Sequence, residues 1–306
     1  MSTVLITGGA GFIGSHVARA YLGAGHRVIV LDDLSTGRKK LVPDGAEFLD
    51  IDIRDPGIVE AFQRLRPEVV NHLAAQVSVV RSAREPQVDA SINIIGAVNV
   101  LDSAARAGVK RVIFSSTGGA LYGEPQKLPC DEQHPIAPLS PYGVAKYCIE
   151  QYLRYFARLR SLPFVILRYG NVYGPGQDPF GEAGVVAIFT QRMLKDEQCH
   201  IFGDGAQERD YVYVEDVAQA NVLALKQGEG ETFNIGTGEA MSVNQLHRLL
   251  AGITGCIRPA IFERARPGEV FRIYLDASKA KRELGWRPQV TFEEGLRRTV
   301  AAFRAA

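Results

Sequence analysis

A tyrosine and a lysine four residues apart are the first pair in this sequence whose types and spacing could do chemistry. Tyr142 and Lys146 follow Ser140-Pro141, which is a typical start of a helix. Residues four apart lie on one face of a helix, so the phenol and the ammonium group are expected side by side. A nearby cation favours phenolate and lowers the pKa of a tyrosine from about 10. Tyr142 is therefore predicted to act as a base near neutral pH.

Three hydroxyl residues are predicted to lie near this pair. Ser115, Ser116 and Thr117 end an apolar run, RVIFSST. If the run is a strand of a parallel sheet, its hydroxyl groups lie at the carboxyl edge, where α/β sheets bind ligands. A tyrosine–lysine pair alone is common on amphipathic helices, and the hydroxyl groups distinguish this one. We expect the hydroxyl, phenol and ammonium groups to converge on one cleft.

A glycine-rich segment near the start of the chain predicts a phosphate-binding turn. The first strand, TVLIT, is followed by Gly8, Gly11 and Gly14 in a GxxGxxG spacing that opens a helix. Gly8 allows the tight turn, Gly11 lets the backbone approach a pyrophosphate at the helix N-terminus, and Gly14 permits close packing of helix on strand. This strand–turn–helix context predicts a bound dinucleotide.

Acidic residues at the end of the second strand indicate which dinucleotide binds. The run RVIVL ends in Asp32-Asp33, where an acid accepts hydrogen bonds from the adenosine ribose and repels a 2′-phosphate. The basic residues 38–40 weaken this preference without reversing it. We therefore predict NAD rather than NADP, and its positive nicotinamide ring would add to the lowering of the Tyr142 pKa.

Two further strand ends are consistent with a bound dinucleotide. Asp52 and Ile53 are expected at the end of the third strand, where the adenine would rest, although Asp52 could equally cap a helix. The small residues of Leu73-Ala74-Ala75 are expected to end the fourth strand and to leave room for the cofactor.

These residues require a framework of alternating strands and helices. The first half of the chain alternates short β-branched runs with helix-like stretches, which is typical of buried parallel strands joined by crossover helices. The predicted fold is α/β, a Rossmann-type doubly wound parallel sheet with a smaller C-terminal α/β substrate lobe. The expected strands are residues 3–7, 27–31, 47–51, 68–74, 111–115 and 163–168, and the expected helices begin at Phe12 and Pro141 or cover residues 58–64 and 89–107.

The alternating rhythm ends after about Asn171, at the Gly/Pro-rich loop NVYGPGQDPFGEAG. Residues 1–170 are predicted as the NAD-binding Rossmann domain, which also carries the tyrosine, the lysine and the hydroxyl residues. Residues 171–306 are predicted as mainly the substrate-binding lobe, with short strands in CHIFG, DYVYV and TFNIG and some segments that return to the first domain.

The composition excludes several other classes of protein. The chain has 306 residues, and its 35 basic and 34 acidic residues leave a net charge of +1, which gives no field for nucleic acid or an anionic membrane surface. No basic n-region opens the sequence, and no apolar run is long enough to span a bilayer. Four cysteines without a CxxC pair and six histidines without ligand spacing predict free thiols and no metal site. We expect a reducing compartment, most simply the cytoplasm.

A series of ordered motifs resembles a known family. They are TGGAGFIG, HLAAQ, SSTGGALYGE, SPYGVAK, RYGNVYGPGQ, RDYVYVEDVA, FNIGTG and ARPGE, with a closing ELGW. By these motifs the chain resembles the extended short-chain dehydrogenase/reductases. Within them it is similar to the NAD-dependent nucleotide-sugar epimerases of the UDP-glucose (UDP-galactose) 4-epimerase type. The resemblance runs over nearly the whole chain.

The resemblance implies a role for each reactive group. Thr117 occupies the position that hydrogen-bonds the reacting sugar oxygen, with Ser116 as the alternative. Tyr142 resembles the base that takes the 4-hydroxyl proton, and Lys146 the residue that holds the nicotinamide ribose and tunes Tyr142. Hydride would pass from sugar C4 to NAD and return to the other face of a 4-keto sugar. The implied cofactor-binding residues are Gly8, Gly11, Phe12, Ile13, Gly14, Asp32, Asp33, Leu34, Ser35, Thr36, Gly37, Asp52, Ile53, Leu73, Ala74, Ala75, Gln76, Asn93, Ser115, Tyr142, Lys146 and Tyr169.

The resemblance also implies a nucleotide-sugar site in the second lobe. Arg209 and Arg266 match positions that clamp a diphosphate, for which guanidinium groups are well suited. Ile273 matches a position beside the sugar 2-substituent, where isoleucine leaves more room than a large aromatic residue. Tolerance of UDP-GlcNAc and UDP-GalNAc besides UDP-glucose and UDP-galactose follows as a hypothesis. The implied substrate-binding residues are Thr117, Asn171, Val185, Ile201, Phe202, Arg209, Arg266, Glu269 and Ile273.

Departures from sister activities narrow the predicted reaction. Similar 4,6-dehydratases carry an Asp-Glu pair just after the Ser/Thr for acid–base elimination, and UDP-glucuronate decarboxylases tend to carry a glutamate there. This sequence has Gly118-Gly119-Ala120 instead. An NAD-dependent UDP-hexose 4-epimerase, an isomerase, is therefore predicted. The resemblance also implies a homodimer that packs the helices near residues 89–107 and 141–160.

Three alternatives to this prediction stay open. The substrate could be UDP-glucuronate, whose extra carboxylate would need a donor near the sugar. A net reductase would consume NADPH, which the acidic end of the second strand disfavours. A non-catalytic NAD-dependent binding protein of the same fold would be expected to have lost Tyr142 or Lys146, and both are present.

Overall fold

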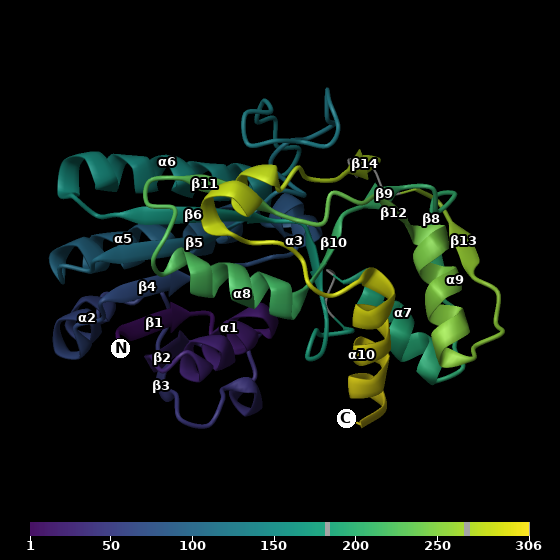
Figure 1. The fold of residues 1–306 in the computed structure, drawn as a ribbon, viewed down its shortest axis with the longest axis horizontal. Helices are drawn as coiled ribbons and strands as arrows, with labels where there is room; N and C mark the ends of the chain where they lie inside the picture. The colour runs from purple at the N-terminus through teal and green to yellow at the C-terminus, as the bar shows by residue number, and fades with distance from the viewer. Residues whose placement is uncertain (181–183, 266–269, 306) are drawn as a thin grey trace.

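The computed structural model describes residues 1–180, 184–265 and 270–305 (Figure 1). Within these residues, seven parallel strands form one sheet in the order β11-β6-β5-β4-β1-β2-β3. The order reverses between β4 and β1, which is the switch point where open α/β sheets bind ligands. The strands are β1 (Thr3–Thr7), β2 (Arg27–Asp32), β3 (Glu47–Asp50), β4 (Val69–His72), β5 (Arg111–Thr117), β6 (Phe164–Tyr169) and β11 (Thr232–Ile235).

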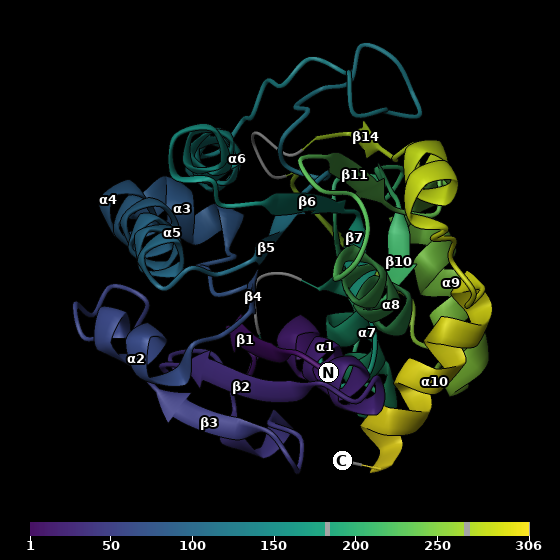
Figure 2. The same cartoon turned by 60° about the vertical axis from the view of Figure 1, so that its left-hand side comes forward.

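Helices cover both faces of this sheet, which explains why its strands are apolar on both sides. On one face, Val30, Ile113 and Leu167 pack with α1 and α8. On the other, Leu31 and Phe114 pack with α2, α5 and α6, and Figure 2 shows the two helical layers. The predicted doubly wound α/β fold is thus confirmed. The covering helices are α1 (Phe12–Gly23), α2 (Ile58–Leu65), α5 (Ala97–Arg106), α6 (Pro141–Arg160) and α8 (Val214–Ala224).

The crossover between β4 and β5 differs from the single helix expected over residues 89–107. It begins with α3 (Val79–Arg84), which the sequence did not indicate, and continues as α4 (Pro86–Ala90), the π-helical segment Ser91–Gly96 and α5. Proline at the first position of α4 restarts the helix after the break. Segments of π-helix are frequent at functional sites, and this one lies beside the loop that follows β4.

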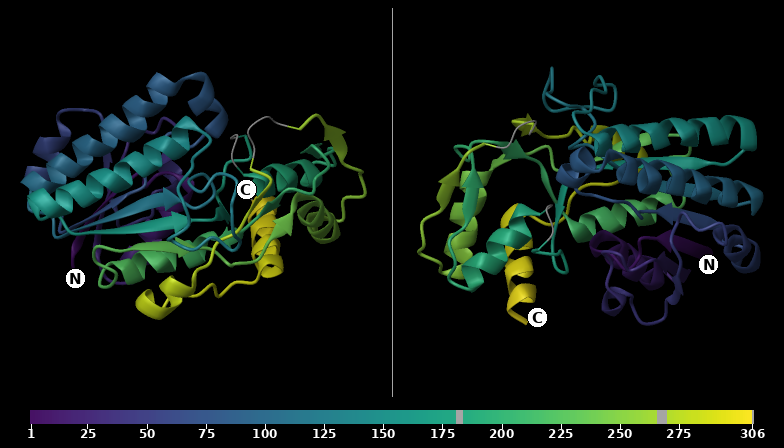
Figure 3. Two further views of the ribbon diagram at one scale, coloured as in Figure 1. Left: turned by 90° about the horizontal axis from the view of Figure 1, so that it is seen from above. Right: turned by 180° about the vertical axis from the view of Figure 1, so that it is seen from behind.

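The second lobe lies beside the carboxyl ends of the central strands (Figure 3). Its core is formed by α7, α9 and α10 around Tyr173, Phe189 and Leu246. Small sheets complete it: β7 pairs with β10, β8 with β13, and β9 lies between β12 and β14. The elements are α7 (Val185–Leu194), α9 (Val243–Thr254), α10 (Phe292–Ala305), β7 (Asn171–Tyr173), β8 (His200–Phe202), β9 (Glu208–Arg209), β10 (Tyr211–Tyr213), β12 (Met241–Ser242), β13 (Ile261–Glu263) and β14 (Arg272–Ile273).

Two segments from the second half of the chain join the first. The run TFNIG forms β11, which pairs in parallel with β6 and completes the large sheet. Helix α8 packs on α1, and the indole of Trp286 donates a 2.8 Å hydrogen bond to the carbonyl of Asp216 at the start of α8. The chain therefore crosses between the two parts more than once.

Candidate active site

The tyrosine and the lysine both lie in the first two turns of α6. Ser140 caps this helix by accepting a hydrogen bond from the amide of Gly143 at 3.2 Å, and Pro141 occupies the first helical position. The ammonium nitrogen of Lys146 lies 5.8 Å from the centre of the Tyr142 ring and donates a 2.9 Å hydrogen bond to the carbonyl of Ser115. The structure thus brings the predicted pair together at the end of β5.

Burial sets the protonation of this pair. The side chain of Lys146 is buried, and desolvation lowers its pKa to about 8, against the charges of Asp89 and Glu150. Desolvation also raises the pKa of Tyr142, and Asp89 raises it further. The expectation of a Tyr142 pKa below its ordinary value is therefore wrong for the chain itself, because burial raises this pKa.

The three hydroxyl residues at the end of β5 have different environments. Ser116 is buried and donates a 2.7 Å hydrogen bond to Glu150, while the Ser115 hydroxyl lies 3.0 Å from that of Tyr169 on the other face. Thr117 is half-buried, and its hydroxyl makes no hydrogen bond within the described residues. Of the three, Thr117 therefore has the hydroxyl that is available to a ligand.

A buried ion pair that the sequence did not predict fixes α6 to the sheet. Arg168 of β6 binds Glu150 of α6 at 2.6 and 3.0 Å, and also donates to the hydroxyl of Tyr122 at 3.0 Å. Glu150 follows Lys146 by one helical turn, and this spacing is only a weak sequence signal that Glu150 has a role near the site. Its pairing with Arg168 becomes visible only in the fold. The pair holds the helix that carries Tyr142 against β6, which is paired with the strand that carries Thr117.

The glycine-rich turn forms a cradle at the start of α1. Gly8 has a φ of +73°, and a Cβ on it would lie 2.6 Å from the amide nitrogen of Ala74. A Cβ on Gly14 would lie 2.2 Å from the carbonyl oxygen of Gly8, whereas one on Gly11 would meet only that oxygen, at 3.2 Å. No side chain caps the helix at Gly11, and no acid lies in its first turn. Its first amide groups are therefore directed at an anion site.

The acids after β2 lie beside this cradle. Asp32 is buried and accepts hydrogen bonds from the amides of Ala10 at 3.0 Å and Leu34 at 2.9 Å. Its carboxylate retains free acceptor positions, since two oxygens offer about four. Asp33 is exposed and binds the backbone and hydroxyl of Ser35. A carboxylate at this position fits a ribose, and the cradle fits a pyrophosphate, so the residues present fit a dinucleotide.

Several other predicted cofactor residues lie around the cradle. Strand β3 ends at Asp50, so Asp52 and Ile53 lie beyond it and not at its end as expected. Asp52 binds Arg54 in a turn, at 2.8 Å from the backbone amide, and Ile53 is buried. The remainder begin α1 (Phe12, Ile13), follow β2 (Leu34, Ser35, Thr36, Gly37), follow β4 (Leu73, Ala74, Ala75) or end β6 (Tyr169).

Gln76 and Asn93 meet in a buried corner after β4. Asn93 accepts from the Gln76 amide at 2.8 Å and donates to the Gln76 carbonyl at 2.9 Å. Both side-chain amides donate 2.9 Å hydrogen bonds to the same oxygen of Asp89. The sequence did not indicate Asp89, although its spacing of four residues from Asn93 is that of neighbours on a helix.

Of the predicted substrate residues, Thr117 ends β5, and Asn171 of β7 adjoins it. A Cβ on Gly119 would lie 3.5 Å from the Asn171 side chain and 3.9 Å from the Thr117 hydroxyl, so these three positions adjoin. Arg209 and Ile273 are register partners of β9 and β14. Ile201 is buried in β8, next to Phe202, and Val185 begins α7. Arg266 and Glu269 lie outside the described residues.

The described residues offer neither a metal site nor a membrane-spanning helix. No group of three or more His, Cys, Asp and Glu side chains is arranged to hold a metal ion. None of the described helices has the length and apolar character needed to cross a bilayer.

A glycine cradle after β1, an acid after β2 and a tyrosine–lysine pair beside β5 define a nucleotide-dependent enzyme of the Rossmann class. Residues 4–236 match the family described as NAD dependent epimerase/dehydratase family. The chain belongs to this family.

Known proteins of the family are similar over almost their whole length. A "Putative UDP-glucose 4-epimerase" of Methanocaldococcus jannaschii is 48% identical over 297 residues, covering 97% of each chain. The crystal structure of UDP-glucose 4-epimerase with UDP-glucose from Thermotoga maritima superposes with a TM-score of 0.97 at 52% identity and 99% coverage of both chains. That of UDP-glucose 4-epimerase from Thermus thermophilus, in complex with NAD, gives 0.96 at 44% identity and the same coverage.

Proposed function

We propose that this chain is an NAD-dependent 4-epimerase of UDP-hexoses that interconverts UDP-glucose and UDP-galactose. The observation that carries the proposal is that Lys146 lies 5.8 Å from the Tyr142 ring and binds the carbonyl of Ser115, in the strand that ends with Thr117. Relatives named for this activity, at 44% to 52% identity, support it.

The cofactor would be held by the first half of the chain. The amides at the start of α1 would bind its pyrophosphate, Asp32 its adenosine ribose, and Lys146 its nicotinamide ribose. When bound, NAD supplies a hydride acceptor and donor beside the sugar C4. The residues after β4 would lie beside the cofactor, between its adenosine and nicotinamide halves. The hydrogen bonds between Gln76 and Asn93 fix this segment.

The chain's own chemistry is the movement of one proton. Thr117 would donate or accept a hydrogen bond at the sugar 4-oxygen, and Tyr142 would take the 4-hydroxyl proton as C4 is oxidised. Burial raises the pKa of Tyr142, so a positive charge must stabilise the phenolate before this residue can act as a base near neutral pH. Lys146 contributes one such charge at 5.8 Å from the phenol ring. The same proton returns to the oxygen when C4 is reduced on its other face.

The residues after Thr117 support epimerisation over elimination. A Cβ on Gly118 would lie 2.5 Å from Leu275, so this position has no room for an acid. Gly119 adjoins the Thr117 hydroxyl and leaves space there, with no proton-transfer group of its own. Elimination of water would need such a group.

The second lobe would bind the nucleotide-sugar. We propose that Arg209 contacts the diphosphate and that Asn171 contacts the diphosphate or the sugar near Thr117. We further propose Val185, Ile201 and Phe202 as the uridine site. The roles of Arg266 and Glu269 in this site are proposed from the sequence alone. Ile273, a partner of Arg209 in the small sheet, is proposed to leave room for a 2-acetamido group.

The experiment that tests this function uses the purified chain without added cofactor. UDP-glucose, UDP-galactose, UDP-GlcNAc, UDP-GalNAc and UDP-glucuronate are incubated separately, and the stereoisomers formed are resolved by chromatography. The proposal predicts interconversion of the first two, since the cofactor is retained and not consumed. Turnover only of UDP-glucuronate, or no turnover with NAD bound, would contradict it.

We also propose that two copies associate through α6 and the crossover helices. Val144, Tyr152, Tyr155 and Leu159 form an exposed apolar stripe along α6, with 63% of Leu159 accessible. Exposed apolar patches of this kind are typical of interfaces. Light scattering should give the mass of a dimer, and Tyr155→Glu should give a monomer. A monomeric wild-type chain would contradict this.

The compartment is proposed from the thiols. All four cysteines are free, and Cys130 and Cys199 are buried. Free thiols suit a reducing compartment such as the cytoplasm.

A further inference from the structure

Asp89 is a buried acid that forms no ion pair with any described cationic side chain. Its side chain is 1% exposed, and one carboxylate oxygen accepts the hydrogen bonds of Gln76 and Asn93. The second oxygen is buried and has no hydrogen-bond partner among the described residues. Both donors are neutral amides. A buried carboxylate in such a place is costly unless a positive charge lies nearby.

Lys146 is a buried base that likewise has no ion-pair partner among the described residues. Its ammonium group donates to a backbone carbonyl and forms no ion pair with a described carboxylate. Glu150 lies one turn further along α6, but its charge is balanced by Arg168 at 2.6 Å. Asp89 is therefore the nearby acid whose charge is left to balance Lys146. At low dielectric, two charges interact over longer distances than an ion pair spans.

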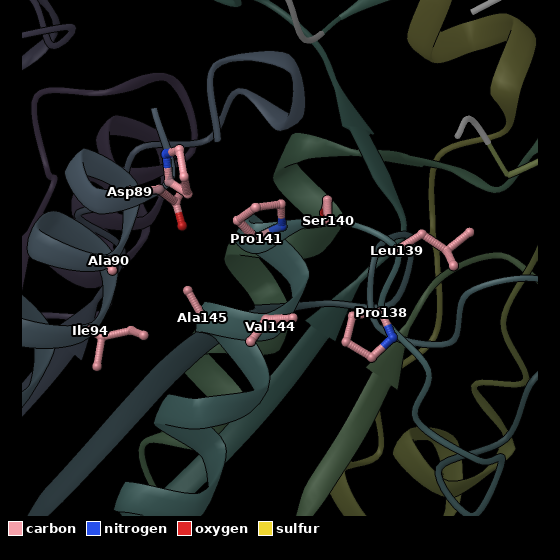
Figure 4. Close-up of a pocket in the computed structure, with 10 residues that line it drawn as sticks. Asp89, Ala90, Ile94, Pro138, Leu139, Ser140, Pro141, Val144 and Ala145 are labelled. Carbon is pink, nitrogen blue, oxygen red and sulfur yellow. The ribbon is translucent and has the colours of Figure 1, made fainter. Parts of the chain in front are cut away.

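The fold places Asp89 against the start of α6. A pocket between α4 and α6 is lined by Asp89 and Ala90 on one side and by Pro141, Val144 and Ala145 on the other (Figure 4). Pro141 and Ala145 directly precede Tyr142 and Lys146 in the sequence. Asp89 thus faces the turn of α6 that carries the reactive pair.

We propose that Asp89 is a positioning residue for the reaction, because its carboxylate fixes the Gln76–Asn93 corner and supplies the negative charge that balances the buried ammonium group of Lys146. This inference rests on the proposed function. The side chain of Asp89 hydrogen-bonds Gln76 and Asn93 and, among the described residues, none of the hydroxyl groups of β5. It acts through Lys146 and Tyr142.

The electrostatics of the pair agree with this geometry. Asp89 raises the pKa of Lys146, which burial has lowered to about 8, and it also raises the pKa of Tyr142. Burial raises the pKa of Asp89 itself, against its two amide donors and the charge of Lys146. A negative charge at Asp89 therefore moves both titrations of the pair to higher pH.

Other charged groups near α4 face solvent. Arg81 and Arg84 of α3 are exposed, and Arg81 is paired with Glu85 at 3.2 Å. The π-helical segment Ser91–Gly96 and the loop after β4 contribute no charged side chain. On α6, Tyr142 and Lys146 are the groups that interact with the charge of Asp89. His72 of β4 is a further titratable neighbour of Lys146, and burial and the charge of Lys146 lower its pKa. The effect of Asp89 should therefore be measurable at the reactive pair.

The test compares Asp89→Asn with Asp102→Asn, which removes a carboxylate from the surface of α5. The amide keeps the shape of the side chain and can still accept from Gln76 and Asn93. The holoenzyme of each variant is assayed for UDP-galactose turnover from pH 5 to 10. Asp89→Asn should move both limbs of the pH profile down by about one unit, while Asp102→Asn should leave them in place. A profile that loses height without moving would overturn the proposal.

A second readout does not depend on the proposed activity. Lysine labelled with ¹³C at Cε is titrated by NMR in the same proteins, and the Lys146 signal is assigned by its absence in Lys146→Met. The midpoint should fall in Asp89→Asn and stay in Asp89→Glu, which keeps the charge. An unchanged midpoint would overturn the proposal even if no UDP-sugar reacted. If Asp89→Asn does not fold, Asp89→Ser takes its place with the same two outcomes.

Discussion

The Ser116 hydroxyl donates a 2.7 Å hydrogen bond to the Glu150 carboxylate, in the buried layer between β5 and α6. The Ser116 hydroxyl therefore donates its proton to a contact that joins β5 to α6. Its neighbour Thr117 keeps a hydroxyl without a partner among the described residues. The sequence left open which of the two contacts the sugar oxygen, and this relationship favours Thr117.

Alanine at Thr117 should therefore impair catalysis, whereas alanine at Ser116 should impair stability. Thr117→Ala should lower kcat about a hundredfold, as loss of one aligned hydrogen bond does, and leave stability nearly unchanged. Ser116→Ala should reduce the free energy of unfolding by about 1–3 kcal/mol, because a hydrogen bond to a buried charge is lost. Steady-state kinetics and urea unfolding measure both. A larger loss of kcat in Ser116→Ala than in Thr117→Ala would reverse the assignment.

Gly14→Ala should remove bound NAD. Its methyl group would lie 2.2 Å from the Gly8 carbonyl oxygen and 2.8 Å from the Gly9 backbone, so the cradle must open. Gly23→Ala is the matched control, since it lies in the same helix and a Cβ there meets nothing within 4 Å. We expect the nucleotide content per protein, measured by absorbance after denaturation, to fall below about a tenth in Gly14→Ala, since the third glycine sets the helix–strand packing. Equal contents in the two variants would be evidence against the cradle.

Lys146→Met should remove a rise in stability that wild type shows at alkaline pH. Burial lowers the Lys146 pKa to about 8, below its value in the unfolded chain, so the folded protein loses this proton first. Below pH 8 the buried ammonium group costs stability. As pH rises from about 8 to 10.5, the unfolded state binds more protons, and wild type gains on the variant by up to about 3 kcal/mol. Urea unfolding across this range measures the gain, which Lys226→Met, at an exposed site, should not show.

Ile273→Tyr should restrict the range of substrates. Ile273 is buried in β14 and packs with Tyr122 and Leu275. A larger ring there would fill the space proposed for the 2-acetamido group. We expect the ratio of kcat/KM for UDP-GlcNAc to that for UDP-glucose to fall at least about tenfold, since steric overlap costs more than 1 kcal/mol. Ile273→Val should leave the ratio high. If wild type already rejects UDP-GlcNAc, the proposed tolerance is wrong.

The features that the sequence predicted well are local. The apolar runs of β1, β2, β4, β5 and β6 are buried on both faces, so their short length and β-branched residues identify them. Tyr142 and Lys146 lie on one helix, and Ser140 and Pro141 indicate in the sequence where this helix begins. The glycine spacing of residues 8–14 likewise needs only the strand before it and the helix after it.

The features that the sequence missed depend on contacts between distant segments. Glu150 on a helix pairs with Arg168 on a strand, and neither local sequence indicates which residue is the partner. Asp89 meets Gln76 only because the chain turns back after β4. The π-helical segment Ser91–Gly96 interrupts what reads as one amphipathic helix, and β11 joins the sheet from 60 residues beyond β6. Tertiary packing decided each of these.

The most direct test of the account follows one hydrogen atom. UDP-glucose carrying deuterium at C4 is incubated with the purified protein in ordinary water, and the UDP-galactose formed is examined by mass spectrometry and NMR. Since the same hydrogen leaves C4 and returns to its other face, the product should keep the deuterium at C4. Exchange of that deuterium for solvent hydrogen would show that C4 loses a proton instead, and would contradict the central claim.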